Sequence, residues 1–289
     1  MDNGCLPRPL EKENAMKRTL STLCTASLLF LSACGGGGSS PAATATGYFI
    51  DSPVAGLSYT SGGQTGITGS DGSFTYEVGQ PITFKLGSMV LGTVTVDKNK
   101  RIFPVDLVNG ANDETHANVS LMAQVLQSLD SDGDPSNGIT ISNQTRAAIA
   151  TAINLANVDP QAALTLIQSA LGNTSLVTPS QARDHIRTNL IKEYAGTWTG
   201  TYSGGDRGPC SVTINTTGNI TGSCTSQGFG NTPFSINGTV SSSGDSTVGN
   251  ATTGASFTGT YQRYGEVNGT WTNNTLNISG TFTLKRQAS

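Results

Sequence analysis

The residues best suited to chemistry are three aspartates in a short polar segment. Asp130, Asp132 and Asp134 alternate within a run that also contains Gly, Pro, Ser and Asn, and that follows an apolar stretch with helical spacing. Carboxylates at alternate positions of a tight loop can direct their oxygens onto one hard cation such as Ca²⁺. The alternative is a solvated turn, because the same residue types are the ones that turns prefer.

The start of this segment resembles the calcium loops of EF-hand and dockerin-like proteins. In those loops the sixth position is Gly and the twelfth is a bidentate Glu, whereas this chain has Pro135 and Ile141 there. The resemblance therefore implies only weak Ca²⁺ binding, in the range of roughly 10⁻⁴–10⁻³ M. We expect no other cofactor.

Motifs for catalysis are absent from the sequence. His116 and His185 are its two histidines, which excludes a multi-histidine metal site. No G-x-S-x-G, H-E-x-x-H, Walker A or dinucleotide-binding pattern occurs. His185 follows Asp184 on the polar side of a predicted helix, so we expect it to lie at the surface. We expect a protein that is not an enzyme. A polysaccharide- or peptidoglycan-associated enzyme with an unrecognised site is the alternative.

The charge balance narrows the class of partner. Lys and Arg number 16 and Asp and Glu 19, so the formal net charge is −3 and the chain has no basic field for nucleic acid. Charged residues make up only 12% of the chain, and 36 residues are glycine. Low charge with abundant Gly, Thr and Asn is typical of secreted β-rich proteins.

Residues 16–34 resemble a bacterial lipoprotein signal. Met16-Lys17-Arg18 is a basic start, an apolar stretch follows, and Leu31-Ser32-Ala33-Cys34 matches a lipobox. The apolar stretch is too short to span a membrane. The resemblance implies that residues 16–33 are removed and that Cys34 carries the lipid anchor.

The flanking residues agree with this interpretation. Residues 1–15 fit no signal peptide and are predicted to be a misassigned start. After Cys34, residues 34–46 are rich in Gly, Ser, Ala and Thr, which predicts a flexible tether. Gly35 rather than Asp follows the cysteine, so the resemblance implies the outer membrane. We expect either its periplasmic or its cell-surface face.

Two further cysteines are predicted to form a disulfide. Cys5 and Cys24 lie upstream of the predicted cleavage point and Cys34 is lipidated, which leaves Cys210 and Cys224. If the chain folds back at residues 216–218, these two cysteines face each other directly across a hairpin. An oxidising cell envelope favours the disulfide. Two buried thiols are the alternative.

Residues 47–108 are predicted to form a small β-sandwich, since short apolar runs alternate with Gly-, Pro- and Asp-rich turns. The segments Asp51–Tyr59 and Thr68–Tyr76 resemble the carboxypeptidase-regulatory-like module. This resemblance implies a transthyretin-like sandwich, in which Asp71-Gly72 is a turn. Strands are expected at Gly47–Ile50, Leu57–Thr60, Gly66–Thr68, Ser73–Tyr76, Ile82–Leu86 and Val90–Val96.

Residues 109–194 are predicted to form a unit of four helices that contains the Asp-rich loop. Apolar residues recur at helical spacing in four sets. Asp159-Pro160 and Thr178-Pro179 are typical helix starts. The sets are Leu121–Leu129; Ile149, Ala152, Ile153 and Ala156; Ala163–Leu171; and Ala182–Tyr194.

Residues 195–289 are predicted to form an eight-stranded antiparallel meander closed into a β-barrel. Six segments share the pattern apolar-polar-Gly-Thr/Ser-apolar, which places each Gly on the same face as its apolar neighbours. An inward Gly allows the sharp coiling that a narrow barrel needs. An open meander or sandwich is the alternative. The repeated glycines are Gly200, Gly222, Gly238, Gly259, Gly269 and Gly280.

The Gly-rich barrel behind a lipidated cysteine resembles transferrin-binding-protein-like surface lipoproteins. Gly196-Thr197-Trp198 also resembles the first strand of lipocalin and avidin barrels, where the Trp closes the barrel base. These resemblances imply a non-enzymatic outer-membrane lipoprotein that presents a barrel on a stalk. Its expected contacts are the membrane, through the anchor, and an extracellular or periplasmic protein or glycan. A host-protein or small-ligand binding lipoprotein is the alternative.

Overall fold

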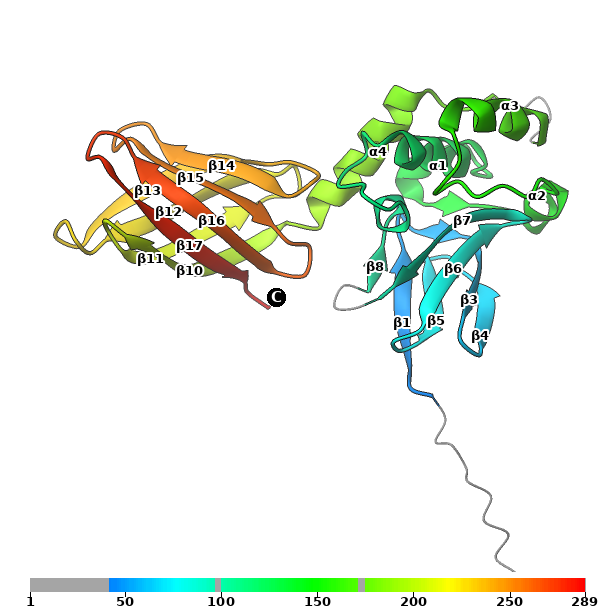
Figure 1. Ribbon diagram of the computed structural model, residues 1–289, viewed down its shortest axis with the longest axis horizontal. Coiled ribbons are helices and arrows are strands. Elements are labelled where there is room, and N and C mark those ends of the chain that lie inside the picture. Colours follow the sequence, from blue (N-terminus) through cyan, green and yellow to red (C-terminus); the bar gives the residue numbers. More distant parts are fainter. Residues whose placement is uncertain (1–41, 97–99, 171–174, 289) are drawn as a thin grey trace, which may run out of the picture. The chain divides into compact units, whose positions relative to one another are not determined.

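The computed structural model describes residues 42–96, 100–170 and 175–288 (Figure 1). Cys34, the predicted signal and most of the predicted tether lie outside these ranges. Among the described residues, no helix combines the length and the apolar character needed to cross a membrane. The fold is mainly β, with N-terminal sheets, a few helices and a C-terminal closed barrel.

The N-terminal strands are assembled into two main sheets. One has the order β5-β1-β8 and the other β4-β3-β6-β7. The predicted strands are confirmed within a few residues, and β2, β8 and β9 are additional short ones. The bounds are β1 (Thr44–Phe49), β2 (Val54–Ala55), β3 (Ser58–Ser61), β4 (Gln64–Ile67), β5 (Ser73–Glu77), β6 (Pro81–Leu86), β7 (Met89–Thr95), β8 (Arg101–Ile102) and β9 (Ile139–Thr140).

Aromatic side chains join these two sheets face to face, as a sandwich requires. The ring of Phe84 on β6 lies 4.8 Å from that of Phe49 on β1 and 5.0 Å from that of Phe74 on β5, both edge-on. All three side chains are buried. Asp71-Gly72 forms the predicted turn, because Asp71 Oδ1 accepts a hydrogen bond from the Ser73 amide at 3.0 Å and Gly72 has a φ of +77°.

Four helices accompany the sheets. They are α1 (Ala117–Ser128), α2 (Asn143–Ala148), α3 (Pro160–Ala170) and α4 (Pro179–Lys192), with 3₁₀ turns at Pro104–Leu107 and Pro135–Asn137. The helices α1, α3 and α4 contribute buried residues to the same core as the sheets, whereas α2 has none. Both predicted helix starts are confirmed: Asp159 accepts a hydrogen bond from the Ala162 amide, and Thr178 accepts one from that of Gln181. The buried apolar residues of sheets and helices form one continuous cluster from Phe49 to Leu190.

The helix predicted from Ile149 to Ala156 is wrong. The helix α2 ends at Ala148, and the following segment runs in extended form beside β7. The amide of Val90 donates to the carbonyl of Ile153 at 2.8 Å, and the amide of Leu155 donates to the carbonyl of Val90 at 2.9 Å. The sheet edge thus supplies the hydrogen bonds that a helix would have made internally. Ile149 and Ala156 are still buried in the core and Ile153 packs against it, whereas Ala152 is exposed.

The C-terminal strands form the predicted closed barrel. Each strand pairs antiparallel with the next, and the last pairs with the first. Figure 1 shows the barrel strands in the yellow-green to red part of the chain. Their bounds are β10 (Gly196–Gly204), β11 (Gly208–Ile214), β12 (Asn219–Ser226), β13 (Thr232–Val240), β14 (Asp245–Asn250), β15 (Ala255–Tyr261), β16 (Glu266–Asn273) and β17 (Ile278–Arg286).

The repeated glycines allow the backbones of neighbouring strands to approach closely inside the barrel. A Cβ atom on Gly280 would lie 1.8 Å from the carbonyl oxygen of Ser203, and one on Gly200 would lie 2.0 Å from that of Thr283. The other four repeat glycines would bring a Cβ within 3.0 Å of a neighbouring backbone oxygen. Their inward orientation, predicted from the alternation, is confirmed.

One end of the barrel is closed by aromatic side chains. Trp198 is fully buried, its ring lies edge-on to Tyr261 at 4.8 Å, and its indole N–H donates to the carbonyl of Tyr194 at 2.9 Å. The Tyr194 hydroxyl in turn donates to the carbonyl of Ser242 at 3.1 Å. Trp198 therefore occupies the position that the lipocalin-like resemblance implies.

The disulfide between Cys210 and Cys224 is confirmed. The two residues are directly paired on β11 and β12, and their Cα atoms are 4.1 Å apart. The turn of this hairpin lies at residues 215–218. The disulfide therefore joins the hairpin near its far end, where β11 begins and β12 ends.

We predict that Gly259→Val destabilises the barrel by about 1–3 kcal/mol, because its Cβ would lie 2.9 Å from both the Asn268 carbonyl oxygen and the ring of Phe282. The matched control is Thr258→Val, which faces solvent on the same strand and should stay within about 0.5 kcal/mol. Tryptophan fluorescence during thermal unfolding reports on the barrel, since both tryptophans of the chain lie there. Equal melting temperatures for the two variants would contradict the inward orientation.

Candidate functional site

A cavity of about 230 Å³ opens at the end of the barrel opposite Trp198. Its walls come from residues at the strand ends and from the loops that join β10 to β11, β12 to β13, β14 to β15 and β16 to β17. Most of the lining is apolar. The apolar side chains are Phe229, Pro233, Phe234, Ala255, Phe257, Trp271, Leu276 and Ile278.

The aromatic rings of the cavity are packed around Tyr202. Its ring lies edge-on to Trp271 at 5.3 Å, to Phe257 at 5.8 Å and to Phe234 at 6.2 Å. Phe257 is in turn stacked with Trp271, with ring centroids 6.1 Å apart. Each ring is held by its neighbours, so the packing of the protein's own side chains shapes the cavity.

Two large apolar side chains form the exposed rim. Phe229 is 50% exposed and Leu276 is 49% exposed, and both also line the cavity. They lie in the β12–β13 and β16–β17 loops, away from the paired strands. The rim extends the apolar lining to the surface.

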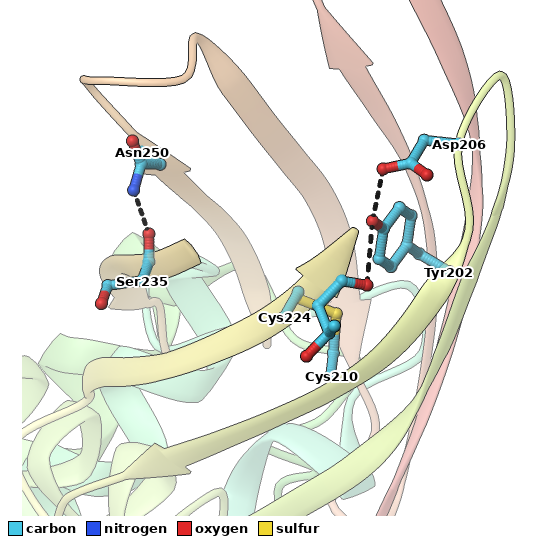
Figure 2. The surroundings of a disulfide bond; sticks show 7 residues. Tyr202, Asp206, Cys210, Cys224, Ser235 and Asn250 are labelled. Atoms are coloured by element: carbon cyan, nitrogen blue, oxygen red, sulfur yellow. Dashed lines mark hydrogen bonds between the residues drawn. A yellow bond between two sulfur atoms is a disulfide. The ribbon is translucent and has the colours of Figure 1, made fainter. Parts of the chain in front are cut away.

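Asp206 places one carboxylate in this apolar lining. The hydroxyl of Tyr202 donates to Asp206 Oδ2 at 2.7 Å, and the amide of Gly228 donates to Oδ1 at 2.9 Å. The first hydrogen bond holds the β10–β11 loop to β10, and the second ties this loop to the β12–β13 loop. Figure 2 shows Tyr202 pointing toward Asp206, beside the Cys210–Cys224 disulfide.

Hydrogen bonds and burial together determine the ionisation states of Asp206 and Tyr202. Burial raises the pKa of Asp206, but hydrogen bonds led by that from Tyr202 outweigh burial and bring the pKa below its usual value. Burial, with the neighbouring Asp206 carboxylate, raises the pKa of the Tyr202 hydroxyl. At neutral pH the cavity therefore holds a carboxylate and a neutral phenol.

Asparagine side chains hold the other loops of this end. The amide of Asn273 donates to the Thr253 carbonyl at 2.9 Å, while its Oδ1 accepts from the amides of Thr275 and Leu276. Asn250 Oδ1 accepts from the Thr253 amide, and its side-chain amide donates to the Ser235 carbonyl (Figure 2). The side-chain amides of Asn250 and Asn273 are thus occupied by hydrogen bonds within this end of the barrel.

The Asp-rich loop directs its carboxylates to its own chain. Asp130 Oδ1 accepts from the amide of Thr140, Asp132 Oδ1 from that of Asp134, and Asp134 Oδ1 from that of Ser136. In the part of the chain that the structure describes, no group of three or more His, Cys, Asp or Glu side chains is arranged to hold a metal ion. The calcium site stays a sequence prediction without support from this geometry.

His185 is not at the surface, so that prediction is wrong. Its side chain is 19% exposed, and Nε2 lies 3.1 Å from the hydroxyl of Ser52 and 3.2 Å from the carbonyl oxygen of Asp51. The turn at residues 51–52 covers the polar face of α4, and Asn189 joins the same network. His116, the other histidine, caps α1 by accepting from the Asn118 amide.

The contact between Ser52 and His185 lacks the order of a catalytic triad. In a triad the serine and the carboxylate bind opposite nitrogens of the imidazole. Here Asp51 Oδ1 lies 3.7 Å from Nε2, the same nitrogen that contacts Ser52. Asp51 is fully buried, and burial raises its pKa to about 7 although Gln127 donates a hydrogen bond to it. This network links α1 and α4 to the turn after β1.

Sequence reasoning missed the residues that line the cavity. Asp206 was one of many polar residues in Gly-rich loops, and no local pattern distinguished it. Phe234 was missed because its strand carries the Gly repeat only later, at Gly238. Tyr202, Phe257 and Trp271 were predicted to face inward but were not assigned to a cavity.

No known protein family matches this chain, and no curated protein sequence matches it. Two solved structures of engineered proteins are similar to part of it. One is a de novo designed fluorescence-activating β-barrel, with 15% identity over 34% of this chain and 97% of that chain, at a TM-score of 0.27. The other is a redesigned β-barrel, with 15% identity over 34% of this chain and 96% of that chain, also at a TM-score of 0.27.

We predict that Asp51 makes the N-terminal part less stable as the pH rises. The folded state keeps a proton on Asp51 up to about pH 7, whereas the unfolded chain releases it near pH 4, so stability falls between these values. The loss should be on the order of a few kcal/mol. Asp51→Asn should remove it, as measured by melting of the helical circular dichroism signal from about pH 4.5 to about pH 8.

The sign of the pH dependence separates Asp51 from His185. Burial lowers the pKa of His185, so its contribution to stability rises with pH and opposes the fall that Asp51 causes. Melting followed by tryptophan fluorescence reports on the barrel and should not change. The same pH dependence in both proteins would contradict the role of Asp51.

Proposed function

We propose that this protein is a non-enzymatic lipoprotein of the bacterial outer membrane whose barrel binds a small apolar ligand at its open end. The observation that carries the ligand-binding part is the apolar, ring-lined cavity opposite Trp198. The anchor rests on the resemblance of residues 16–34 to a lipoprotein signal. The tether and the N-terminal part would then hold the barrel away from the membrane.

The size of the cavity limits the ligand. A dry cavity of about 150 Å³ is enough to bind benzene, and pockets for drug-sized molecules have about 300–1,000 Å³. At about 230 Å³, this cavity suits a molecule of one or two rings, or a branched aliphatic group of that size. A long lipid chain or an oligosaccharide would extend well beyond it.

The rigidity of the cavity favours binding of such a small molecule. Tyr202, Phe257 and Trp271 are already packed against one another, so few side chains need to become ordered when a ligand enters. The Cys210–Cys224 disulfide holds the neighbouring strands, and the Thr225 carbonyl beside it lies 3.3 Å from the Tyr202 hydroxyl. Burial of apolar ligand surface then supplies the binding free energy.

A second candidate function is contact with a partner protein. The exposed side chains of Phe229 and Leu276 support it, because neighbouring exposed apolar groups at a cavity rim are typical of interaction sites. In that case a side chain of the partner would enter the cavity. Binding of a small molecule that is lost when a larger side chain fills the cavity would favour ligand binding over contact with a partner protein.

We predict that the barrel binds neutral probes such as benzyl alcohol and cyclohexanol, and that Ala255→Leu weakens this binding at least about tenfold. Ala255 is buried and lines the cavity, so the larger side chain fills the space that the probe needs. Binding is measured by NMR titration of the purified full chain. Thr258→Val, which faces solvent on the same strand, is the matched control and should bind like the wild type. No saturable binding by the wild type, or equal binding by Ala255→Leu, would overturn the proposal.

We predict that Cys34→Ser moves the protein from the membrane fraction to the soluble fraction without changing its melting temperature. The lipid would be attached to this thiol, and the predicted tether separates it from the folded parts. Cys24→Ser is the matched control, since the predicted cleavage removes that residue. Mass spectrometry of the mature wild type should show the lipid on Cys34. A Cys34→Ser protein that remains in the membrane fraction would contradict the anchor.

A further inference from the structure

Among the described residues, the carboxylate of Asp206 has no cationic partner. It is only 8% exposed and lines the cavity, and within residues 42–96, 100–170 and 175–288 it forms no ion pair. None of the side chains that line the cavity is Lys, Arg or His. Its hydrogen bonds, which include those from the Tyr202 hydroxyl and the Gly228 amide, come from neutral donors. The cavity therefore carries an uncompensated negative charge.

Aromatic rings surround the same space. Tyr202, Phe234, Phe257 and Trp271 all line the cavity that Asp206 lines. The negative faces of such rings attract cations, most strongly when the cation is desolvated. A nearby carboxylate adds a Coulombic attraction that is stronger in an apolar cavity than in water. The rings and the carboxylate therefore both favour a positively charged ligand.

We propose that the ligand of this cavity is a small organic cation, an ammonium group on an apolar body, bound between the aromatic rings and the carboxylate of Asp206. This inference rests on the proposed function, since it names the chemical class of the ligand that the barrel binds. The apolar body would occupy the ring-lined space and the ammonium would lie toward Asp206. Anionic ligands are disfavoured because they would meet the carboxylate in a poorly solvated place.

Asp206 also holds the barrel loops through its hydrogen bonds, so a bound cation must leave these hydrogen bonds intact. A carboxylate attracts an ammonium group through space and needs no free acceptor position to do so, whereas its hydrogen bonds with Tyr202 and Gly228 hold the loops. A cation can therefore approach without displacing Tyr202 or Gly228. The interaction with the loops and the interaction with the ligand are compatible.

The test compares choline with 3,3-dimethyl-1-butanol on the wild-type full chain. The two probes have nearly the same shape and the same hydroxyl group, but only choline is charged. NMR titrations at matched salt give both dissociation constants. We expect choline to bind about tenfold more tightly, a difference that a desolvated cation–π contact with a nearby carboxylate can supply.

Asp206→Asn then assigns the preference to the carboxylate. In this variant the ratio of the two dissociation constants should fall close to one, and melting followed by tryptophan fluorescence checks that its barrel is folded. Equal binding of the two probes by the wild type would overturn the cation proposal and leave ligand binding standing. A preference for choline that survives in Asp206→Asn would overturn the role of Asp206. Binding of neither these probes nor benzyl alcohol by the wild type would overturn both proposals.

Discussion

The close approach of backbones at the inward glycines is the constraint on which the barrel depends. At Gly200, Gly269 and Gly280 there is no room for a Cβ atom, because carbonyl oxygens of the neighbouring strands lie within 2.3 Å of where it would be. Eight short strands can close only if they coil strongly, and glycine permits that coiling at mid-strand. The aromatic residues two positions away then supply the volume that the glycines leave out. Interior packing and barrel closure therefore come from one repeated pattern.

This division of volume explains why the cavity lies at one end. Beside Trp198, the aromatic rings are covered by Tyr194 and the tight turn at residues 241–244, so that end is filled. At the other end the loops are held by hydrogen bonds to the side chains of Asp206 and Asn250 and by one from the side-chain amide of Asn273. Polar groups that satisfy loop backbones cannot also fill the interior. The space above Tyr202 is consequently left open and apolar.

Much of the fold could be predicted because its signals are local and periodic. The alternation in the barrel indicated strand pairing, glycine orientation and the facing of Cys210 and Cys224, all of which follow from the two-residue repeat of a strand. The helix predicted at residues 149–156 was wrong because the spacing of apolar residues fits a helix, while the backbone hydrogen bonds are made with β7, which is far away in sequence. The surroundings of His185 and the role of Asp206 could not be predicted for the same reason. Their roles depend on the turn at Ser52 and on the loop at Gly228, which no spacing within their own segments reveals.

The two buried aspartates show how such non-local partners determine what a carboxyl group does. Asp51 is fully buried with one side-chain donor, Gln127, and desolvation dominates, so it keeps a proton near neutral pH and acts as a neutral link between elements. Asp206 is also buried, but Tyr202 and backbone amides donate to it, and these hydrogen bonds keep it ionised. A neutral carboxyl needs no counterion, whereas a carboxylate in an apolar cavity gains from one. The carboxylate that the barrel buries without a counterion is thus the one that faces the open cavity.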